Sequence, residues 1–489
     1  MKNNSLKNLF SLFLLYILFN STNQIAIPIK LVKSSFNKRL NKTIPLTSTT
    51  QPSNMISQDI IDLVDYLFAI DIKVGSEGQI FTMLIDTGSE IAWVPGIIDQ
   101  GSDRYFNPSS SKTSKRTSDS FNYGYSAGIV SGIYYNDQIN FMLEKNFYFT
   151  FGVATKMNIE RVGFDGVLGL GRKYYINNKK YSLLETIKTN GAITSTKFSF
   201  KYDYNTKDLT FYLGEKHEDF SKSNVASCRL IQSEIYETDL WLCDLYSFGI
   251  KKDDEIITRI SIEYEGLFDT GTNNMMFPLE ILRDLESTFL SFDCYINEEG
   301  DRAGSVKAVY CRDENNLPKI TFGLKSYILT LGKENFYSKL RVNNQYIYRL
   351  RLLFVEGLNI CVIGQNFFYE FHTLFDDDVG ELMFYNDEAN TILPHEEKAR
   401  IKLWVLLTLI FGGILFLASA AFILVYCLCC RKNSYVPLDQ KLLEMSSIQK
   451  LEDNNEDNAD SNFNQIMNIT TKVNKKSFNK RNKNNKNKN

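Results

Sequence analysis

Two short segments of the chain carry an aspartate in the same local sequence, and each follows an apolar run. Residues 81–89 read FTMLIDTGS and residues 266–272 read GLFDTGT. An apolar run that ends in Asp-Thr-Gly predicts a buried strand with a carboxylate at its end, Asp86 in the first segment and Asp269 in the second. Because a buried carboxylate is costly unless its charge is used or shared, the pattern points to chemistry at these two positions.

Asp, Thr and Gly are also ordinary turn formers, and average composition places one Asp-Thr-Gly by chance in roughly one chain of this length in ten. Two copies, each after an apolar run and before a hydroxyl residue, are about a one-in-a-hundred event on the same composition. If the two turns pack face to face, Asp86 and Asp269 share a proton, because two like charges a few ångströms apart cannot both ionise at low cost. Such a pair can deprotonate a water for attack on an amide carbonyl and protonate the departing nitrogen.

The residues beside each aspartate suit a shared site. The glycines allow close backbone approach, the threonines can tie the two turns together, and the next hydroxyl residues can donate to the outer carboxylate oxygens. These supporting residues are Thr87, Gly88 and Ser89 in the first turn and Thr270, Gly271 and Thr272 in the second.

Short β-branched and aromatic runs with Gly, Asn and Asp between them dominate residues 65–390, which predicts a mostly β body. Helical patterns are expected only around residues 181–189 and 278–287. An apolar-apolar-Gly segment follows each acid, FDGVLGLG at 164–171 and CVIGQNFF at 361–368. This repeated order predicts an internal duplication of a β lobe of about 160 residues, with a cleft between the copies.

The ends of the chain differ from this body. Residues 1–24 join two lysines to an apolar run too short to span a bilayer, which is typical of a secretory signal peptide. Residues 403–430 carry no charge and as a helix would be about 42 Å long, which predicts one transmembrane helix. Residues 391–402 are then a juxtamembrane linker, and the Asn- and Lys-rich residues 431–489 a disordered cytosolic tail. The formal net charge of −2 gives no indication of a nucleic-acid partner.

A signal peptide followed by one span predicts a single-pass type I membrane protein with the β body in the lumen or outside the cell. Five cysteines then lie in an oxidising compartment and three at the cytosolic membrane face: Cys228, Cys243, Cys294, Cys311 and Cys361, then Cys427, Cys429 and Cys430. The spacings from Cys294 to Cys311 and from Cys228 to Cys243 suit disulfides, which leaves Cys361 over. The last three are candidate palmitoylation sites or plain membrane-edge cysteines.

Over residues 25–390 the chain resembles the pepsin-like aspartic proteases, family A1. The resemblance rests on five segments in the family's order and near its spacing: IDTGSEIAWVP, FNYGYSAG, FDGVLGLG, LFDTGTNN and VIGQNFFYEFHTLFDDDVGELMFY. It implies a bilobal fold with an N-terminal lobe of residues 65–222 and a C-terminal lobe of residues 223–390. It further implies a monomeric aspartic endopeptidase that cleaves polypeptides with Asp86 and Asp269 as its catalytic pair and needs no cofactor or metal.

The resemblance also assigns roles around the cleft. Tyr123 and Gly124 correspond to the tip of the flap that closes over substrate, and Trp93 to the residue that supports this tyrosine. Residues 25–64, rich in lysine, correspond to the prosegment of a zymogen, whose lysines reach the ionised dyad. A flexible basic linker is the alternative interpretation of this stretch.

Two residues and the flap segment depart from the family pattern, and one cysteine pair follows it. The flap segment YGYSAGIVSG lacks the usual Gly soon after Tyr-Gly. Asn273 replaces the usual Ser after the second Asp-Thr-Gly-Thr, which changes a substrate-facing group. Gln365 stands where many acid-active members have Asp, and the loss of this acid favours activity at milder pH. Cys294 and Cys311 match the disulfide of the family's second lobe.

The alternative to an enzyme is a catalytically inactive relative, a receptor or adhesion ectodomain that uses the cleft for binding. The three histidines, His217, His372 and His395, lie far apart in the sequence, and no zinc-helix motif is present. The segments YVPL at 435–438 and DQKLL at 439–443 resemble sorting signals, which would route the protein to endosomes or lysosome-like vacuoles as an alternative to the cell surface.

Overall fold

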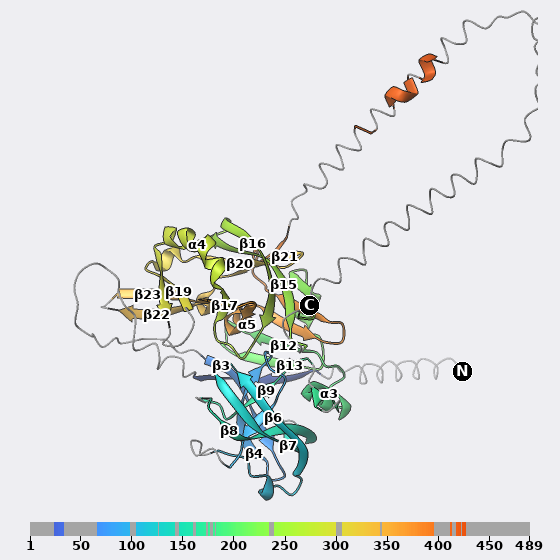
Figure 1. The fold of residues 1–489 in the computed structure, drawn as a ribbon, viewed down its shortest axis with the longest axis vertical. Helices are drawn as coiled ribbons and strands as arrows, with labels where there is room; N and C mark the ends of the chain where they lie inside the picture. The colour runs from blue at the N-terminus through green and yellow to red at the C-terminus, as the bar shows by residue number, and fades with distance from the viewer. Residues whose placement is uncertain are drawn as a thin grey trace, which may run out of the picture. The chain divides into compact units, whose positions relative to one another are not determined.

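The computed structural model describes residues 24–33, 66–97, 104–125, 127–141, 146–159, 163–172, 175–176, 179–180, 182–233, 239–299, 306–342, 345–395, 411–412, 417–421 and 423–426. The chain divides into two compact units, Met1–Glu396 and Glu397–Asn489. All the described strands lie in the first unit (Figure 1), which is mostly β as the sequence predicts.

The first half of the chain builds an eight-stranded sheet with the order β2-β3-β4-β9-β5-β8-β7-β6. Its strands are β2 (Lys30–Lys33), β3 (Tyr66–Val74), β4 (Gln79–Asp86), β5 (Trp93–Pro95), β6 (Lys115–Tyr125), β7 (Gly128–Asn140), β8 (Phe147–Met157) and β9 (Gly166–Gly169). The last four residues of β4 are buried, and the strand ends at Asp86. The first apolar run therefore forms the buried strand that its composition predicts.

The second half builds an eleven-stranded sheet with the order β18-β19-β23-β17-β24-β16-β15-β20-β21-β27, to which β22 adds by pairing with β23. Its strands are β15 (Leu242–Lys252), β16 (Glu255–Phe268), β17 (Met275–Pro278), β18 (Cys294–Glu299), β19 (Val306–Cys311), β20 (Lys319–Gly323), β21 (Tyr327–Leu331), β22 (Tyr337–Val342), β23 (Gln345–Val355), β24 (Cys361–Ile363) and β27 (Ile392–Pro394). β16 ends directly before Asp269.

The two sheets repeat one pattern of pairing around the strands that carry the acids. In the first, β4 runs parallel to β9, β9 antiparallel to β5, and β5 parallel to β8. In the second, β16, β24, β17 and β23 pair in the same way and in the same order. The two apolar-apolar-Gly segments are β9 and β24, so each lies beside the strand that delivers an aspartate.

A third, six-stranded sheet joins the two halves, in the order β1-β13-β12-β25-β26-β14. Its strands are β1 (Ile25–Pro28), β12 (Phe198–Tyr202), β13 (Leu209–Leu213), β14 (Val225–Arg229), β25 (His372–Asp376) and β26 (Glu381–Tyr385). The halves meet where β12 pairs with β25. The lobe boundary expected at residues 222–223 thus falls inside a shared sheet, because strands from both copies hydrogen-bond to each other there.

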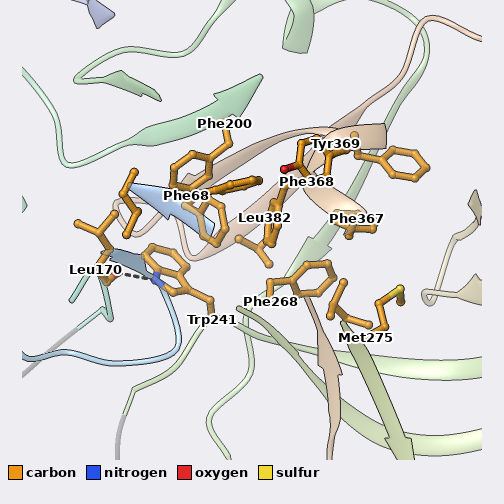
Figure 2. Close-up of a cluster of buried hydrophobic side chains, with 14 of the residues drawn as sticks. Phe68, Leu170, Phe200, Trp241, Phe268, Met275, Phe367, Phe368, Tyr369 and Leu382 are labelled. Atoms are coloured by element: carbon orange, nitrogen blue, oxygen red, sulfur yellow. Dashed lines mark hydrogen bonds between the residues drawn. The ribbon is translucent and has the colours of Figure 1, made fainter. Parts of the chain in front are cut away.

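The core of the first unit includes Phe268, Leu170 and Trp241, which lie next to the two Asp-Thr-Gly turns in the sequence or are linked to them by hydrogen bonds (Figure 2). Phe268, the residue before Asp269, stacks on buried aromatic rings, and the Trp241 indole donates a 2.8 Å hydrogen bond to the carbonyl of Leu170. Leu170 in turn donates its backbone N–H to the carbonyl of Asp86 over 2.8 Å. Burial of each large aromatic side chain contributes about 2 kcal/mol, so this core holds the backbone of both turns rigidly.

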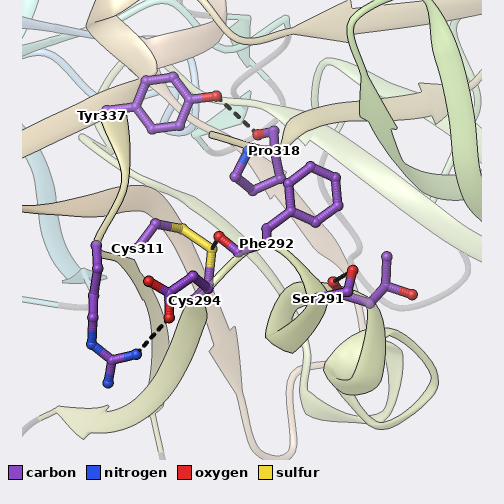
Figure 3. Close-up of a disulfide and its surroundings, with 9 residues drawn as sticks. Ser291, Phe292, Cys294, Cys311, Pro318 and Tyr337 are labelled. Carbon is purple, nitrogen blue, oxygen red and sulfur yellow. Dashed lines mark hydrogen bonds and ion pairs between the residues drawn. A yellow bond between two sulfur atoms is a disulfide. The ribbon is translucent and has the colours of Figure 1, made fainter. Parts of the chain in front are cut away.

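Two disulfides lie in the second half, at both pairs that the sequence suggests. Cys294 and Cys311 face each other across the antiparallel strands β18 and β19 (Figure 3). Cys228 and Cys243 join β14 to β15. Cys361 is buried and free.

Helices are few. They are α3 (Leu183–Thr189), α4 (Leu279–Ser291) and α5 (Gln365–Glu370), with the 3₁₀ turns η1 (Pro108–Ser110), η2 (Glu218–Ser221), η3 (Glu314–Asn316) and η4 (Glu334–Phe336), and the short pair β10 (Tyr175–Ile176) and β11 (Lys179–Lys180). Both predicted helices are present, as α3 and α4. α4 runs four residues past its predicted end at 287, because its buried positions continue to Phe289.

The predicted terminal segments are described only in small part. No helix among the described residues has the length and apolarity needed to cross a bilayer. Within 403–430, only 411–412, 417–421 and 423–426 are described. The rest of that segment, the signal peptide up to residue 23, residues 34–65 and the tail after residue 430 lie outside the described residues. The three membrane-edge cysteines, at the end of the segment 403–430, and the two sorting motifs in the tail also lie outside the described residues.

Candidate active site

The two Asp-Thr-Gly turns meet inside the first unit. A Cβ placed on Gly88 would lie 2.7 Å from Cγ of Asp269, and one placed on Gly271 would lie 2.5 Å from Oδ1 of Asp86. Neither contact is tolerable for a real side chain, so both glycines are needed for the carboxylates to approach. The two carboxyl groups are buried and hydrogen-bond to each other. The structure therefore brings together the two acids that the repeated motif singles out.

Two threonines tie the turns together through four buried hydrogen bonds. The Thr87 hydroxyl donates to the carbonyl of Phe268 (2.7 Å) and accepts the N–H of Thr270 (2.9 Å). The Thr270 hydroxyl donates to the carbonyl of Ile85 (2.9 Å) and accepts the N–H of Thr87 (3.1 Å). Each unpaired buried group would cost about 1–3 kcal/mol, so this exchange fixes the spacing of the two aspartates.

Each carboxylate has the same two local donors, one backbone N–H to Oδ1 and one hydroxyl to Oδ2. For Asp86 they are Gly88 N (2.9 Å) and Ser89 Oγ (2.5 Å), and for Asp269 they are Gly271 N (2.7 Å) and Thr272 Oγ1 (2.5 Å). All six supporting residues predicted from the sequence thus contact an aspartate or the opposite turn.

The surroundings of the first acid disfavour its ionised form. Burial and then the negative charge of Asp269 raise the pKa of Asp86 well above its ordinary value, and the hydrogen bond between the two carboxyl groups acts in the same direction. The bonds from Ser89 and Gly88 oppose this shift but do not cancel it. Asp86 therefore keeps a proton at pH values where an ordinary aspartate has lost it.

The β6–β7 hairpin reaches this site through Tyr125, the last residue of β6. The indole N–H of Trp93 donates to the Tyr125 hydroxyl over 3.0 Å. Burial, followed by the negative charge of Asp86, raises the pKa of Tyr125, although nearby Ser89 acts to lower this pKa. The indole bond of Trp93 thus goes to Tyr125, two residues from Tyr123, while both tyrosines pack against the cluster that contains Trp93. Residues two apart lie on the same face of a strand, so the sequence pattern alone could not distinguish them.

Tyr123 contacts a different residue of the same loop. Its hydroxyl donates a 2.7 Å hydrogen bond to Oε2 of Glu90, which follows Ser89 in the chain and is buried. The rings of Tyr123 and Tyr125 lie with their centroids 4.9 Å apart. Gly124, between them, points to open space, since a Cβ there would meet nothing within 4 Å.

The second lobe contributes Asn273 and Gln365. Asn273 follows Thr272, and its Oδ1 has no hydrogen-bond partner among the described residues. Gln365 is buried, and it donates its side-chain amide to the carbonyl of Thr270 (2.5 Å) and its backbone N–H to the carbonyl of Thr272 (2.8 Å). Gln365 therefore anchors the second Asp-Thr-Gly turn from behind.

A family model described as eukaryotic aspartyl protease matches residues 67–385. The chain belongs to this family. The chain is similar to gastricsin of Oryctolagus cuniculus, with 24% identity over 345 residues that cover 66% of this chain and 81% of gastricsin. It is similar to cathepsin D of Rattus norvegicus, with 22% identity over 365 residues, 69% of this chain and 85% of that protein. The aspartic-type endopeptidase ctsD of Aspergillus fumigatus shares 25% identity over 223 residues, which span 44% of this chain and 45% of that protein.

In this member of the aspartyl protease family, the described residues 24–33 are part of the folded unit. β1 pairs with β13 in the shared sheet, and β2 pairs with β3 beside β4. The Lys30 ammonium group forms an ion pair with Asp71 on β3 and not with the dyad. The other basic residues expected to reach the dyad from residues 34–64 lie outside the described residues.

Among the described residues, one cluster of metal-ligand residue types occurs away from the dyad, formed by His217, Asp219 and His372. Lys201 and Lys222 each donate to the Asp219 carboxylate, over 2.7 and 2.5 Å. Although burial acts to raise it, hydrogen bonds from His372 and the two lysines hold the pKa of Asp219 well below its ordinary value. Two ammonium groups on one carboxylate oppose a cation there, so we interpret this cluster as a structural hydrogen-bond network.

Sequence reasoning missed two residues of the site, Glu90 and Tyr125. The signal for Glu90 was present, because it is the only acid besides Asp86 in residues 81–95. Tyr125 gave no comparable signal, because it lies two residues from Tyr123 on the same strand face.

Proposed function

We propose that the protein is an aspartic endopeptidase in which Asp86 and Asp269 share one proton and activate a water for attack on a peptide bond. The observation that carries this proposal is the mutual approach of two buried, hydrogen-bonded carboxyl groups from two turns of the same sequence. In this mechanism the ionised member of the pair takes a proton from the water, and the protonated member donates to the carbonyl oxygen of the substrate. The dyad then returns a proton to the departing amine, and no cofactor takes part.

The hydroxyl and amide donors hold the two acids in the positions that this reaction needs. Ser89 and Thr272 bind the outer oxygens, so the inner oxygens face each other with a single proton between them. Tyr125 closes one side of the pair through Ser89. We assign it the role in the flap that the sequence suggested for Tyr123.

Incubation of the full chain with a denatured protein between pH 3 and 7 tests this function. We expect pepstatin-sensitive cleavage by the wild type and none by Asp86→Asn or Asp269→Asn. Asp284→Asn, which changes an exposed carboxylate on α4, is the matched control and should cleave normally. A wild type that cleaves nothing after processing would favour the alternative, an inactive ectodomain that binds through its cleft.

We further propose that the enzyme is made as a zymogen and anchored by residues 403–430 as a type I membrane protein, with the protease unit in the lumen or outside the cell. The lysine-rich start of the chain and the uncharged 28-residue segment support this proposal. Acid treatment followed by N-terminal sequencing should reveal a new terminus between residues 45 and 66. Release of the full chain from membranes by carbonate alone, without detergent, would refute the anchor.

A further inference from the structure

Two hydrogen bonds connect the strand β6 to the segment 90–93, which follows the first Asp-Thr-Gly turn and ends at the start of β5. In the first, Trp93 donates to Tyr125, and in the second, Tyr123 donates to Glu90. The two tyrosines are separated by one residue and lie on the same face of β6. The strand is therefore held at two points along its length.

The Glu90 side chain is fixed by more than its bond to Tyr123. A Cβ placed on Gly171 would lie 2.6 Å from Cγ of Glu90, so the backbone after β9 leaves space for this side chain alone. The N–H of Gly171 also donates to the carbonyl of Ser89 over 2.8 Å. Glu90 is thus packed between the backbone after β9 and the flap strand β6. A residue with a side chain at position 171 would occupy the same space.

The Tyr123–Glu90 pair also lies within the electrostatic reach of the dyad. Burial, followed by the negative charge of Glu90 and the hydrogen bond to it, raises the pKa of Tyr123, and Asp86 contributes to the same shift. Tyr123 therefore keeps its proton and stays a donor throughout the acidic range. A buried bond from a phenol to a carboxylate is stronger than one between neutral groups, because one partner carries a charge.

We propose that Glu90 is a positioning residue that, through Tyr123, holds the flap strand β6 so that Tyr125 stays against Ser89 and the dyad. This inference rests on the proposed function, because the flap has a role only if the cleft binds substrate. The pair acts on binding of the substrate and not on the chemistry of the dyad. Its loss should therefore raise KM and leave kcat nearly unchanged.

Substitution of each partner, alone and together, tests the proposal in the full chain. Tyr123→Phe removes one oxygen and Glu90→Ala removes the acceptor, and each should raise KM about tenfold, which corresponds to one charge-assisted hydrogen bond. The double variant should be no worse than either single variant, because the same bond is lost in all three. Glu90→Gln keeps a carbonyl acceptor and should restore most of the affinity. Tyr148→Phe, at an exposed tyrosine on β8, is the matched control.

The dissociation constant of pepstatin, measured on the same variants, separates this proposal from the proposed function. A wild type that binds pepstatin but cleaves no protein would overturn the endopeptidase and leave the flap contact open to measurement. Equal pepstatin affinity and equal KM in the wild type, Tyr123→Phe and Glu90→Ala would overturn the positioning role while the enzyme stands. Additive losses in the double variant would show that the two side chains act separately, which also contradicts the proposal.

Discussion

A buried carboxyl group at the end of α5 should make the stability of the protease unit depend on pH. Glu370 is buried, and its carboxyl group accepts the N–H groups of Gly332 and Lys333 over 3.0 to 3.1 Å. Burial raises the pKa of Glu370 to about 7, although these backbone bonds act to lower it. α5 begins at Gln365 behind the second Asp-Thr-Gly turn, so Glu370 closes the far end of an element that supports the site.

The sign of the effect follows from the two protonation states. In the unfolded chain the carboxyl group releases its proton near its ordinary value of 4.5, whereas in the folded protein it keeps the proton up to about pH 7. The titration of Glu370 therefore has no effect on the free energy of unfolding below pH 4.5, and it lowers this free energy as the pH rises to 7. A shift of this size corresponds to about 3 kcal/mol at pH 8. Glu370→Gln stays neutral and keeps an acceptor oxygen, so it should recover this free energy at pH 8 and change nothing at pH 4.

Urea unfolding followed by tryptophan fluorescence measures this difference. The experiment uses the full chain in the Asp269→Asn background, which prevents self-cleavage. We expect Glu370→Gln to exceed its parent by about 3 kcal/mol at pH 8, with the difference vanishing toward pH 4. The control is Glu286→Gln on the exposed face of α4, which should show no such trend. A difference that is constant between pH 4 and pH 8 would refute the assignment of the effect to the titration of Glu370.

Two further predictions follow from the geometry of the site and of the second lobe. Gly271→Ala should abolish cleavage, because the new Cβ would lie 2.5 Å from Oδ1 of Asp86 and push the two acids apart. The far-ultraviolet circular dichroism should stay unchanged. A variant that retains full activity would show that the turns can separate without loss of function. Replacing both Cys294 and Cys311 by Ser should lower the free energy of unfolding by about 3 kcal/mol, which is the loop-closure value for a crosslink of this length. Urea unfolding under the conditions given above measures this loss. An unchanged unfolding midpoint would contradict the prediction.

His372 provides a second, opposite dependence on pH. Burial lowers the pKa of His372 to about 4, despite the opposing hydrogen bond to Asp219. The unfolded histidine binds a proton below pH 6.5 and the folded one does not, so stability is lost as the pH falls from 6.5 to 4. Glu370 changes in the other direction over nearly the same range. We therefore expect the free energy of unfolding of the wild type to vary little between pH 4.5 and 6.5, because the two groups act in opposite directions. In Glu370→Gln the effect of His372 remains alone, so the free energy of unfolding should decrease as the pH falls over this range.

The sequence predicts the strands and turns of this site better than its side-chain pairings. The apolar runs before Asp86 and Asp269 identify buried strands because one face or both of a core strand must be apolar. The glycine and hydroxyl positions follow from what two close carboxylates require. The shared six-stranded sheet could not be predicted in the same way, since pairing of β12 with β25 joins residues more than 170 positions apart, and no local pattern encodes it. The sequence could not show which tyrosine bonds to Trp93 for a related reason, because Tyr123 and Tyr125 lie two residues apart on the same face of one strand.

The duplicated turns supply symmetry, but peptide hydrolysis requires two acids that behave differently. The local donors are equivalent on both sides, one backbone N–H and one hydroxyl for each carboxylate. The difference must therefore come from outside the turns. In the first lobe Trp93 donates to the hydroxyl of Tyr125 on the flap strand, and this tyrosine lies within electrostatic reach of Asp86. In the second lobe the support for the turn comes from behind, through Gln365. Burial and then the negative charge of Asp269 raise the pKa of Asp86. We therefore expect the hairpin, which only one of the two copies directs over the dyad, to decide which aspartate retains the shared proton.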